Sequence, residues 1–216
     1  MAKEIKISLP LYKIGYAVFF VVILSLIRGV TATYEIGIAL ETPMALLAAA
    51  FCADTYTQEI VSKRSEIHRL YPIKKRKRSL ISRMFVQEIF LFSLAAAGYG
   101  LFFAFQKPMG GTAGETKQYF VFLFAAAATL LFWGMLSNTL AMLFRNMWFG
   151  IGGSLILWLI TNSTLGEHLF GPWNLFSYTF RNVENGGLTW MRGKIISICF
   201  SILMIGILPN IIKKRG

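Results

Sequence analysis

Residues 58–83 read QEIVSKRSEIHRLYPIKKRKRSLISR, and this stretch decides how the chain is organised. It holds nine of the 22 lysines and arginines, between apolar runs long enough to cross a bilayer. A lipid-spanning segment does not tolerate so many charges, so the block must lie outside the membrane. Because cytoplasmic loops of membrane proteins are enriched in lysine and arginine, the block also predicts the orientation of the chain.

The composition is typical of a membrane protein. Hydrophobic residues make up 56% of the 216 residues and charged residues only 15%, so a soluble domain of this length could not bury its apolar surface. The net charge of +12 indicates basic loops rather than nucleic-acid binding. Cys52 and Cys199 lie in apolar runs, so we expect neither a disulfide nor a metal site. We expect a single domain over residues 1–216, without a cleavable signal peptide.

Six apolar segments follow one another along the chain. They cover residues 14–27, 36–53, 89–106, 119–144, 146–166 and 195–212. A spanning helix needs about 20 residues, which predicts an all-α integral membrane protein with six transmembrane helices. With a cytoplasmic N-terminus, the inner segments hold 16 basic residues and the outer segments hold 6. This bias favours both termini inside, in a multi-pass protein of the cell membrane.

The outer loop before the last segment, residues 167–194, is too aromatic to be a free aqueous loop. It predicts either short re-entrant helices at the outer interface or an aromatic belt that anchors the neighbouring helices. Both alternatives place the loop against the outer membrane face. The aromatic residues are Trp173, Phe176, Tyr178, Phe180 and Trp190.

The chain has no pattern typical of a catalytic site. Its two histidines, His68 and His168, fall on opposite sides of the membrane in the six-helix prediction, and no Cys–His, Ser–His–Asp or HExxH arrangement is present. Residues 110–117, GGTAGETK, lack the GK[ST] ending of a phosphate-binding loop. We therefore expect no enzymatic activity and no bound cofactor in this chain.

Two polar features lie inside or beside apolar segments. Glu41 is expected to pair with Arg28 or to line a hydrated outer cavity, because an unpaired carboxylate there is costly. Asn162, Ser163 and Thr164 are expected to hydrogen-bond a neighbouring helix or to face a pathway. Small residues that allow close helix packing are expected in the alanine runs 48–50, 95–97 and 125–128 and at Gly150, Gly152 and Gly153.

The first half of the basic stretch has the pattern of a short amphipathic helix. If residues 59–71 are helical, the apolar residues Ile60, Ile67 and Leu70 or Tyr71 share one face. Charged residues occupy the rest, namely Lys63, Arg64, Glu66 and Arg69. Pro72 ends the helix, because the residue before a proline is disfavoured in helical conformation. From spacing alone, the segment is either a topology anchor or a surface for a partner.

The same residues resemble a known family. Glu59, Glu66 and the run LYPI at 70–73 are similar to the cytoplasmic loop of type-2 ABC exporter permeases, whose pattern is E…GTLE…LLxxPI/VS. Lys63 and Lys74 depart from it, since the family often has Gly and Ser there. Six spans with both termini inside, and an aromatic loop before the last span, are also similar to that family.

The resemblance implies a transport subunit. In such exporters the loop is a coupling helix that docks on a separate ATP-binding subunit, and two permeases assemble with two ATPases. That subunit, not this chain, would bind ATP and Mg²⁺. The aromatic loop would form an outer lid at Trp173, Phe176, Tyr178 and Phe180. The coupling residues would be Glu59, Arg64, Glu66, Ile67, Leu70, Tyr71 and Pro72.

Two functions remain open from the sequence. One is the permease of an ABC exporter, moving an amphipathic or hydrophobic cargo such as a peptide, bacteriocin, lipid or drug, since the spans are nearly chargeless. The other is a membrane-embedded accessory or scaffold protein whose basic loop binds anionic lipid or a soluble partner. An importer permease is disfavoured because its EAA…G loop pattern is missing.

Overall fold

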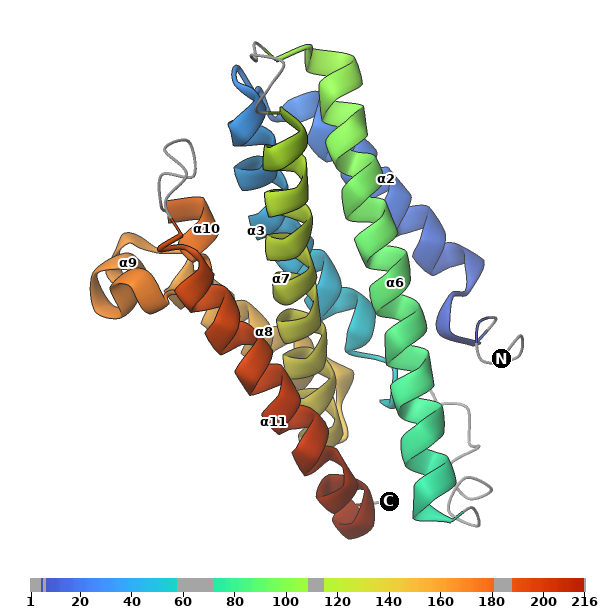
Figure 1. Ribbon diagram of the computed structural model, residues 1–216. Helices are drawn as coiled ribbons and strands as arrows, with labels where there is room; N and C mark the ends of the chain where they lie inside the picture. The colour runs from blue at the N-terminus through green and yellow to red at the C-terminus, as the bar shows by residue number, and fades with distance from the viewer. Residues whose placement is uncertain (1–4, 6, 58–71, 109–114, 181–187, 216) are drawn as a thin grey trace.

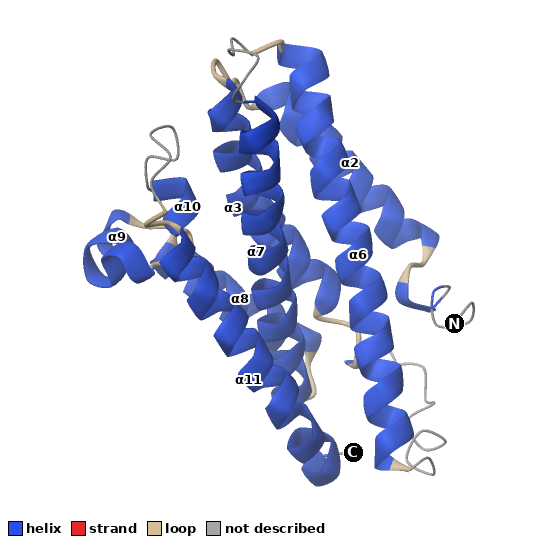
Figure 2. Cartoon of the chain, in the orientation of Figure 1, coloured by secondary structure: helices blue, strands red, loops and turns tan. Residues whose placement is uncertain are grey.

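The computed structural model describes residues 5, 7–57, 72–108, 115–180 and 188–215. All helices and turns of these residues build one bundle without a β-strand (Figure 2). The elements are α2 (Leu11–Ile27), α3 (Thr33–Cys52), α6 (Ile73–Gln106), α7 (Glu115–Phe144), α8 (Met147–Thr161), α9 (Thr164–Phe170), the 3-10 turn η1 (Gly171–Trp173), α10 (Ser177–Phe180) and α11 (Met191–Arg215).

Four helices are long and apolar enough to cross a membrane: α3, α6, α7 and α11. A fifth crossing results if α8 counts as one span with α9 and η1, to which it is joined by a bend of 76°. The shorter α2 has 17 residues and is also apolar. These lengths and compositions are those of a membrane protein.

The outward faces of the helices are apolar, as a lipid-facing exterior requires. On a soluble protein, an apolar surface of this extent would be an aggregation hazard. Exposed hydrophobic residues include Phe19 and Leu26 on α2, Phe85 and Ile89 on α6, Trp148 and Ile156 on α8, and Phe200 and Leu203 on α11.

The two helices α3 and α7 form the centre of the bundle, with α2 and α6 on one side and α8 and α11 on the other (Figure 1). Small side chains let the central pair approach closely. Ala45 and Ala48 of α3 are fully buried, as is Ala125 of α7. Ser137 of α7 also donates a hydrogen bond to the Ala49 carbonyl oxygen over 2.7 Å. The predicted packing role of the alanine runs is confirmed at Ala48 and Ala125.

Two glutamines of α6 fix α2 alongside it. Gln87 donates to the Ser8 carbonyl oxygen over 3.2 Å, and Gln106 donates to the carbonyl oxygens of Ser25 and Arg28 over 2.9 and 2.6 Å. Nineteen residues of helix separate the glutamines, a rise of about 28 Å. This is close to the hydrocarbon thickness of a bilayer, about 30 Å.

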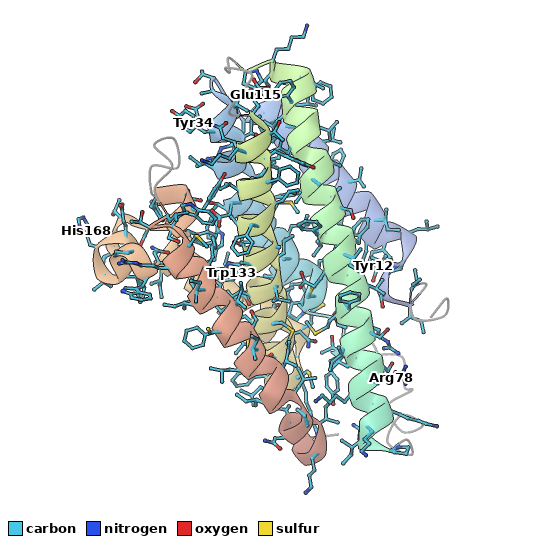
Figure 3. The ribbon with its side chains drawn as sticks, in the orientation of Figure 1. Tyr12, Tyr34, Arg78, Glu115, Trp133 and His168 are labelled. Carbon is cyan, nitrogen blue, oxygen red and sulfur yellow. The ribbon has the colours of Figure 1, made fainter. Side chains whose placement is uncertain are left out.

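The helix α6 is longer than the sequence predicts. The expected segment begins at residue 89, whereas α6 runs without a break from Ile73 to Gln106, 34 residues or about 51 Å. Buried positions recur every three to four residues into its basic half, at Arg76, Leu80 and Arg83. The predicted boundary is wrong because the charges lie on the same helix as the apolar run. Figure 3 shows Arg78 at the opposite end of the bundle from Glu115.

The turn between α7 and α8 is as tight as its sequence predicts. Arg145 takes a positive φ of 55°, and the Asn146 side chain accepts a hydrogen bond from the Trp148 backbone N–H over 2.9 Å. This cap begins α8 immediately. Beyond the turn, Gly150 lies directly against α7. The first turns of α6, the α7–α8 turn and the end of α11 lie at the same end of the bundle (Figure 1).

Replacing Gly150 with alanine should destabilise the α7–α8 contact. The added Cβ would lie 2.6 Å from the Ser137 carbonyl oxygen and 2.8 Å from the Ala141 Cβ, neither of which can move without the backbone. We expect a loss of about 1–3 kcal/mol, measured by denaturant unfolding of the purified protein in detergent. The matched control is Gly152→Ala, because a Cβ there meets nothing within 4 Å. Equal stability of the two variants would contradict the close packing.

Candidate functional site

A buried ion pair joins α3 to the start of α11. The Glu41 carboxylate accepts a hydrogen bond from the Lys194 ammonium, and both side chains are 0% exposed. Lys194 also donates to the Thr129 hydroxyl of α7 over 2.8 Å and to the Leu175 carbonyl oxygen over 2.7 Å. Thr129 in turn donates to Glu41 over 2.9 Å. A buried pair is tolerated only when its remaining donors and acceptors are satisfied in this way.

Arg28, which the sequence suggests as the partner of Glu41, has another role. Pro43 lies inside α3 and lacks the N–H that would bond the Ala39 carbonyl oxygen four residues earlier. Arg28 supplies that missing donor, with its Nη1 3.2 Å from the Ala39 oxygen. The predicted Arg28–Glu41 pair is therefore wrong, because the partner of Glu41 is Lys194.

The segment between α8 and α11 is held onto this ion pair. Thr179 donates to the second Glu41 oxygen over 2.7 Å. Asn174 donates to the Thr161 carbonyl oxygen over 2.9 Å, and Ser177 donates to the Trp190 carbonyl oxygen over 2.6 Å. The described part of the outer loop therefore packs on the bundle, as its aromatic composition predicts.

The aromatic residues of the outer loop differ in burial. Phe176 stacks on Trp133 of α7 with ring centroids 5.6 Å apart, and Tyr178 meets Trp190 edge-on at the same distance. Phe176 and Tyr178 are buried, Phe180 is half-buried, and Trp173 is exposed. Burial, assisted by the nearby Glu41 carboxylate, raises the pKa of the Tyr178 hydroxyl, so this group stays neutral. Of the four predicted lid residues, Trp173 alone faces outward.

The polar triplet at residues 162–164 forms the bend itself. Asn162 is the C-cap of α8 and Ser163 is the N-cap of α9. The Ser163 hydroxyl accepts from the Gly166 N–H over 3.1 Å and donates to the Ile160 carbonyl oxygen over 2.7 Å. Thr164 is the first residue of α9. These Ser163 hydrogen bonds are local, which contradicts the alternative that it bonds a distant helix, whereas the alternative that it faces a pathway stays a prediction.

A second ion pair, away from the first, fixes the start of α2 to the end of α3. Lys13 pairs with Asp54 and donates to the Phe51 carbonyl oxygen over 2.9 Å. A cation at a helix C-terminus also interacts favourably with the helix dipole. Beside it, Thr55 donates to Gln87 of α6 over 2.6 Å. Three helices therefore meet in one polar layer at this end.

The predicted coupling residues Glu59, Arg64, Glu66, Ile67, Leu70 and Tyr71 lie outside the residues that the structure describes. Pro72, the last of the set, is described. It takes the N-cap position of α6 in extended conformation, with φ −54° and ψ 143°. In the sequence, the predicted coupling segment is therefore followed directly by α6.

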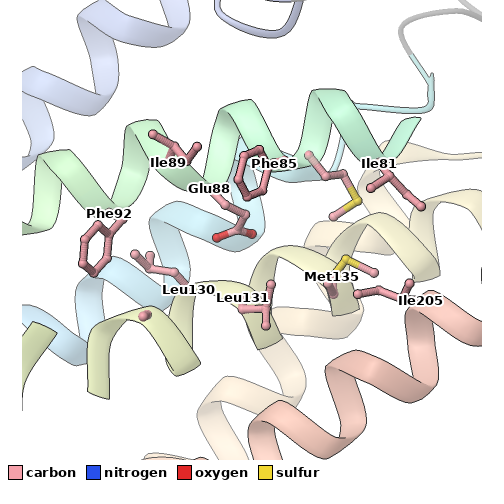
Figure 4. Close-up of a pocket in the computed structure, with 11 residues that line it drawn as sticks. Ile81, Phe85, Glu88, Ile89, Phe92, Leu130, Leu131, Met135 and Ile205 are labelled. Carbon is pink, nitrogen blue, oxygen red and sulfur yellow. The ribbon is translucent and has the colours of Figure 1, made fainter. Parts of the chain in front are cut away.

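Glu88 lies in a different environment from Glu41. It projects from α6 into a cavity of about 330 Å³ between α6 and α7, with Leu130 and Leu131 opposite it (Figure 4). Its one hydrogen-bond partner among the described residues is the Cys52 thiol, whose sulfur lies 3.9 Å from the carboxylate. The rest of the cavity lining is apolar.

Sequence reasoning missed two of these groups. It assigns Lys194 to an outer loop, although Lys194 is the buried partner of Glu41. It places Glu88 just before a span, although Glu88 lies within α6 with apolar cavity-lining residues on both sides. Each is a lone charge beside or inside an apolar run, and that pattern is the only signal the sequence offers.

Comparison of the chain with protein-family models, curated proteins and solved structures finds no match. The function must therefore be argued from the structure and the sequence pattern. Among the described residues, no group of three or more His, Cys, Asp or Glu could hold a metal ion. In the described part of the chain, the arrangement provides an apolar bundle, a polar layer at each end and a carboxyl group, Glu88, in a largely apolar cavity with the Cys52 thiol beside it.

Removing one partner of the outer ion pair should be far more destabilising than removing both. Lys194→Met leaves Glu41 buried without its counter-ion, which costs about 3–5 kcal/mol for pairs of this kind. The double variant Lys194→Met, Glu41→Gln should recover much of that loss, because no unpaired charge remains. The measurement is the free energy of unfolding in detergent, with exposed Lys117→Met as control. A Lys194→Met loss no larger than that of Lys117→Met would contradict the ion pair.

Proposed function

We propose that this chain is the permease subunit of an ABC exporter in the cell membrane, driven by a separate ATP-binding subunit. The observation that carries the proposal is the continuity of α6. This one helix leads from Pro72, where the predicted coupling segment ends, to Gln106 at the outer end. A force applied to the coupling segment would act on a rigid rod that crosses the whole bundle.

The number of membrane crossings fits the proposal. The four helices and the bent α8–α9 pair give five crossings, and α2 would be the sixth. Hydrogen bonds from Gln87 and Gln106 of α6 reach Ser8, just before α2, and Ser25 in α2, so α2 lies at the same depth as the apolar part of α6. Six crossings with the basic ends inside agree with the distribution of lysine and arginine. The bend of 76° after α8 would then turn the outer helices back into the membrane face.

A contact route connects the inner end to the outer loop. The helix α6 packs on α2, α3 and α7, and α7 carries Thr129, which bonds both Glu41 and Lys194. Glu41 also holds Thr179 of the outer segment. Displacement of α6 relative to α7 would therefore reach the helices proposed as a lid.

The proposed assembly contains two ATP-binding subunits and a second permease, identical or different. This chain supplies the pathway and the coupling surface, and the partner subunit hydrolyses ATP with Mg²⁺. Cargo of amphipathic or hydrophobic character suits the apolar interior. The apolar spanning segments would accommodate a highly charged cargo poorly.

A scaffold that binds anionic lipid is the second candidate. Its support is the exposed basic start of α6, where Lys74, Lys75 and Arg78 lie closer to the N-terminal end of the helix than Gln87 does. Each such charge contributes about 1 kcal/mol of attraction to an anionic membrane surface. This function needs no ATP-binding subunit, and that difference separates the two candidates.

The exporter proposal predicts that making α6 less rigid on the cytoplasmic side of the membrane stops it from transmitting movement between its two ends. Lys77→Gly, Arg78→Gly introduces two glycines, each about 1 kcal/mol less favourable than alanine in a helix. The complex purified through a tag on this chain is labelled at a cysteine replacing exposed Trp173, with Cys199 changed to serine. We expect the ATP-dependent change in labelling rate to be lost in the glycine variant.

The matched control is Lys77→Ala, Arg78→Ala, which removes the same charges but keeps the helix, and it should respond to ATP like the unaltered complex. Glu66→Lys should instead remove the ATP-binding subunit from the complex. An equal ATP response in the glycine and alanine variants would refute coupling through α6. If purification of the unaltered chain yields no Mg²⁺-dependent ATP hydrolysis, the scaffold function is favoured.

A further inference from the structure

The cavity around Glu88 has the chemistry of a binding site rather than of a structural contact. A carboxylate in apolar surroundings is expensive unless it is paired or protonated. Glu41 has Lys194, Thr129 and Thr179 for this purpose, whereas the described residues offer Glu88 only the weak thiol donor of Cys52 at 3.9 Å. Stability alone would favour an uncharged residue at position 88.

The neighbouring helix leaves space for this carboxylate. Gly134 of α7 faces Glu88, and a Cβ at that position would meet the Glu88 Oε1 and lie 3.1 Å from the Cys52 sulfur. The missing side chain therefore makes room for the carboxylate. The Glu88 carboxylate and the space left by Gly134 coincide. That space gives the carboxylate room but does not satisfy its hydrogen-bonding needs.

The surroundings of Glu88 suit a hydrophobic cation. Phe85 lies one turn before Glu88 and Phe92 one turn after it along α6, and both line the same cavity (Figure 4). Aromatic rings attract cations through their faces. Leu131 and Met135 of α7 and Ile205 of α11 supply apolar contact. A volume of about 330 Å³ is within the size range of small-molecule pockets.

The position of the cavity along the bundle also favours a hydrophobic cation. Glu88 follows Gln87, which belongs to the inner polar layer with Ser8 and Thr55. A ligand whose charge lies at Glu88 and whose apolar part extends toward Phe92 would lie at the level of the inner leaflet. Cationic amphiphiles concentrate there, because the cytoplasmic leaflet is negatively charged.

We propose that the cavity between α6, α7 and α11 binds a monovalent hydrophobic organic cation, with Glu88 as its counter-ion. As an assignment of cargo class, this site rests on the exporter function proposed above. As a binding site it requires no partner subunit. It narrows the amphipathic or hydrophobic cargo expected from the sequence to molecules that carry one positive charge on an apolar body.

The test uses tetraphenylphosphonium and its shape-matched anion tetraphenylborate as probes. Saturable binding to the full chain in detergent is measured by equilibrium dialysis. We expect the cation to bind saturably and the anion not to do so. Glu88→Gln should weaken cation binding about tenfold or more, the range expected for loss of a charge-assisted contact, and Glu88→Asp should retain part of it.

Two further variants test the geometry. Gly134→Ala should weaken cation binding, because its Cβ displaces the carboxylate, whereas Gly100→Ala, where a Cβ meets nothing within 4 Å, should not. A second measurement needs no variant: tetraphenylphosphonium should protect Glu88 from modification by dicyclohexylcarbodiimide, read by mass spectrometry of the peptide. This arm applies even if a variant fails to fold.

Absence of saturable cation binding, or unchanged binding in Glu88→Gln together with no protection, would overturn the proposal. Equal binding of cation and anion would also do so, because the cavity would then be merely apolar. Since no ATP-binding subunit takes part, these failures leave the exporter function standing. Conversely, cation binding without any cation-stimulated ATP hydrolysis in the reconstituted complex would retain the site and reject its role as a cargo site.

Discussion

The half of the bundle around the start of α11 depends on the ion pair between Glu41 and Lys194. Three helices and the segment before α11 contribute to it, and no water is needed to satisfy its donors and acceptors, because Thr129, Thr179 and the Leu175 carbonyl oxygen do so. Inside a membrane, the protein itself must satisfy every donor and acceptor, since lipid offers no hydrogen bonds. The pair therefore fixes both where α11 begins and where the outer helices lie.

The same constraint explains the other polar contacts. Pro43 frees a carbonyl oxygen that Arg28 takes up, and Lys13 covers one at the end of α3. Glu88 is the exception among these groups, because its described surroundings offer only a thiol. The described bundle thus satisfies Glu41 with several hydrogen bonds and Glu88 with one weak one, and this difference is the basis for proposing Glu88 as the counter-ion of a ligand.

Much of the architecture could be predicted from the sequence, because apolar runs and clustered basic residues are local signals. They gave the helical class, the tight turn at Arg145 and the packing of the outer aromatic residues. The partner of Glu41 could not be predicted, since Lys194 is 153 residues away along the chain and resembles a loop charge. The true start of α6 was missed because the basic residues concealed a helical period that runs through Arg76, Leu80 and Arg83.

The central claim is that α6 leads from a basic cytoplasmic end to the outer face of the membrane. Its most direct test is cysteine labelling in intact cells with a membrane-impermeant maleimide, using Lys75→Cys and Lys117→Cys, both at exposed positions, in a Cys199→Ser chain. The account predicts that the cysteine at position 117 reacts in intact cells, while the one at position 75 reacts only after permeabilisation. Labelling at position 75 in intact cells would contradict it.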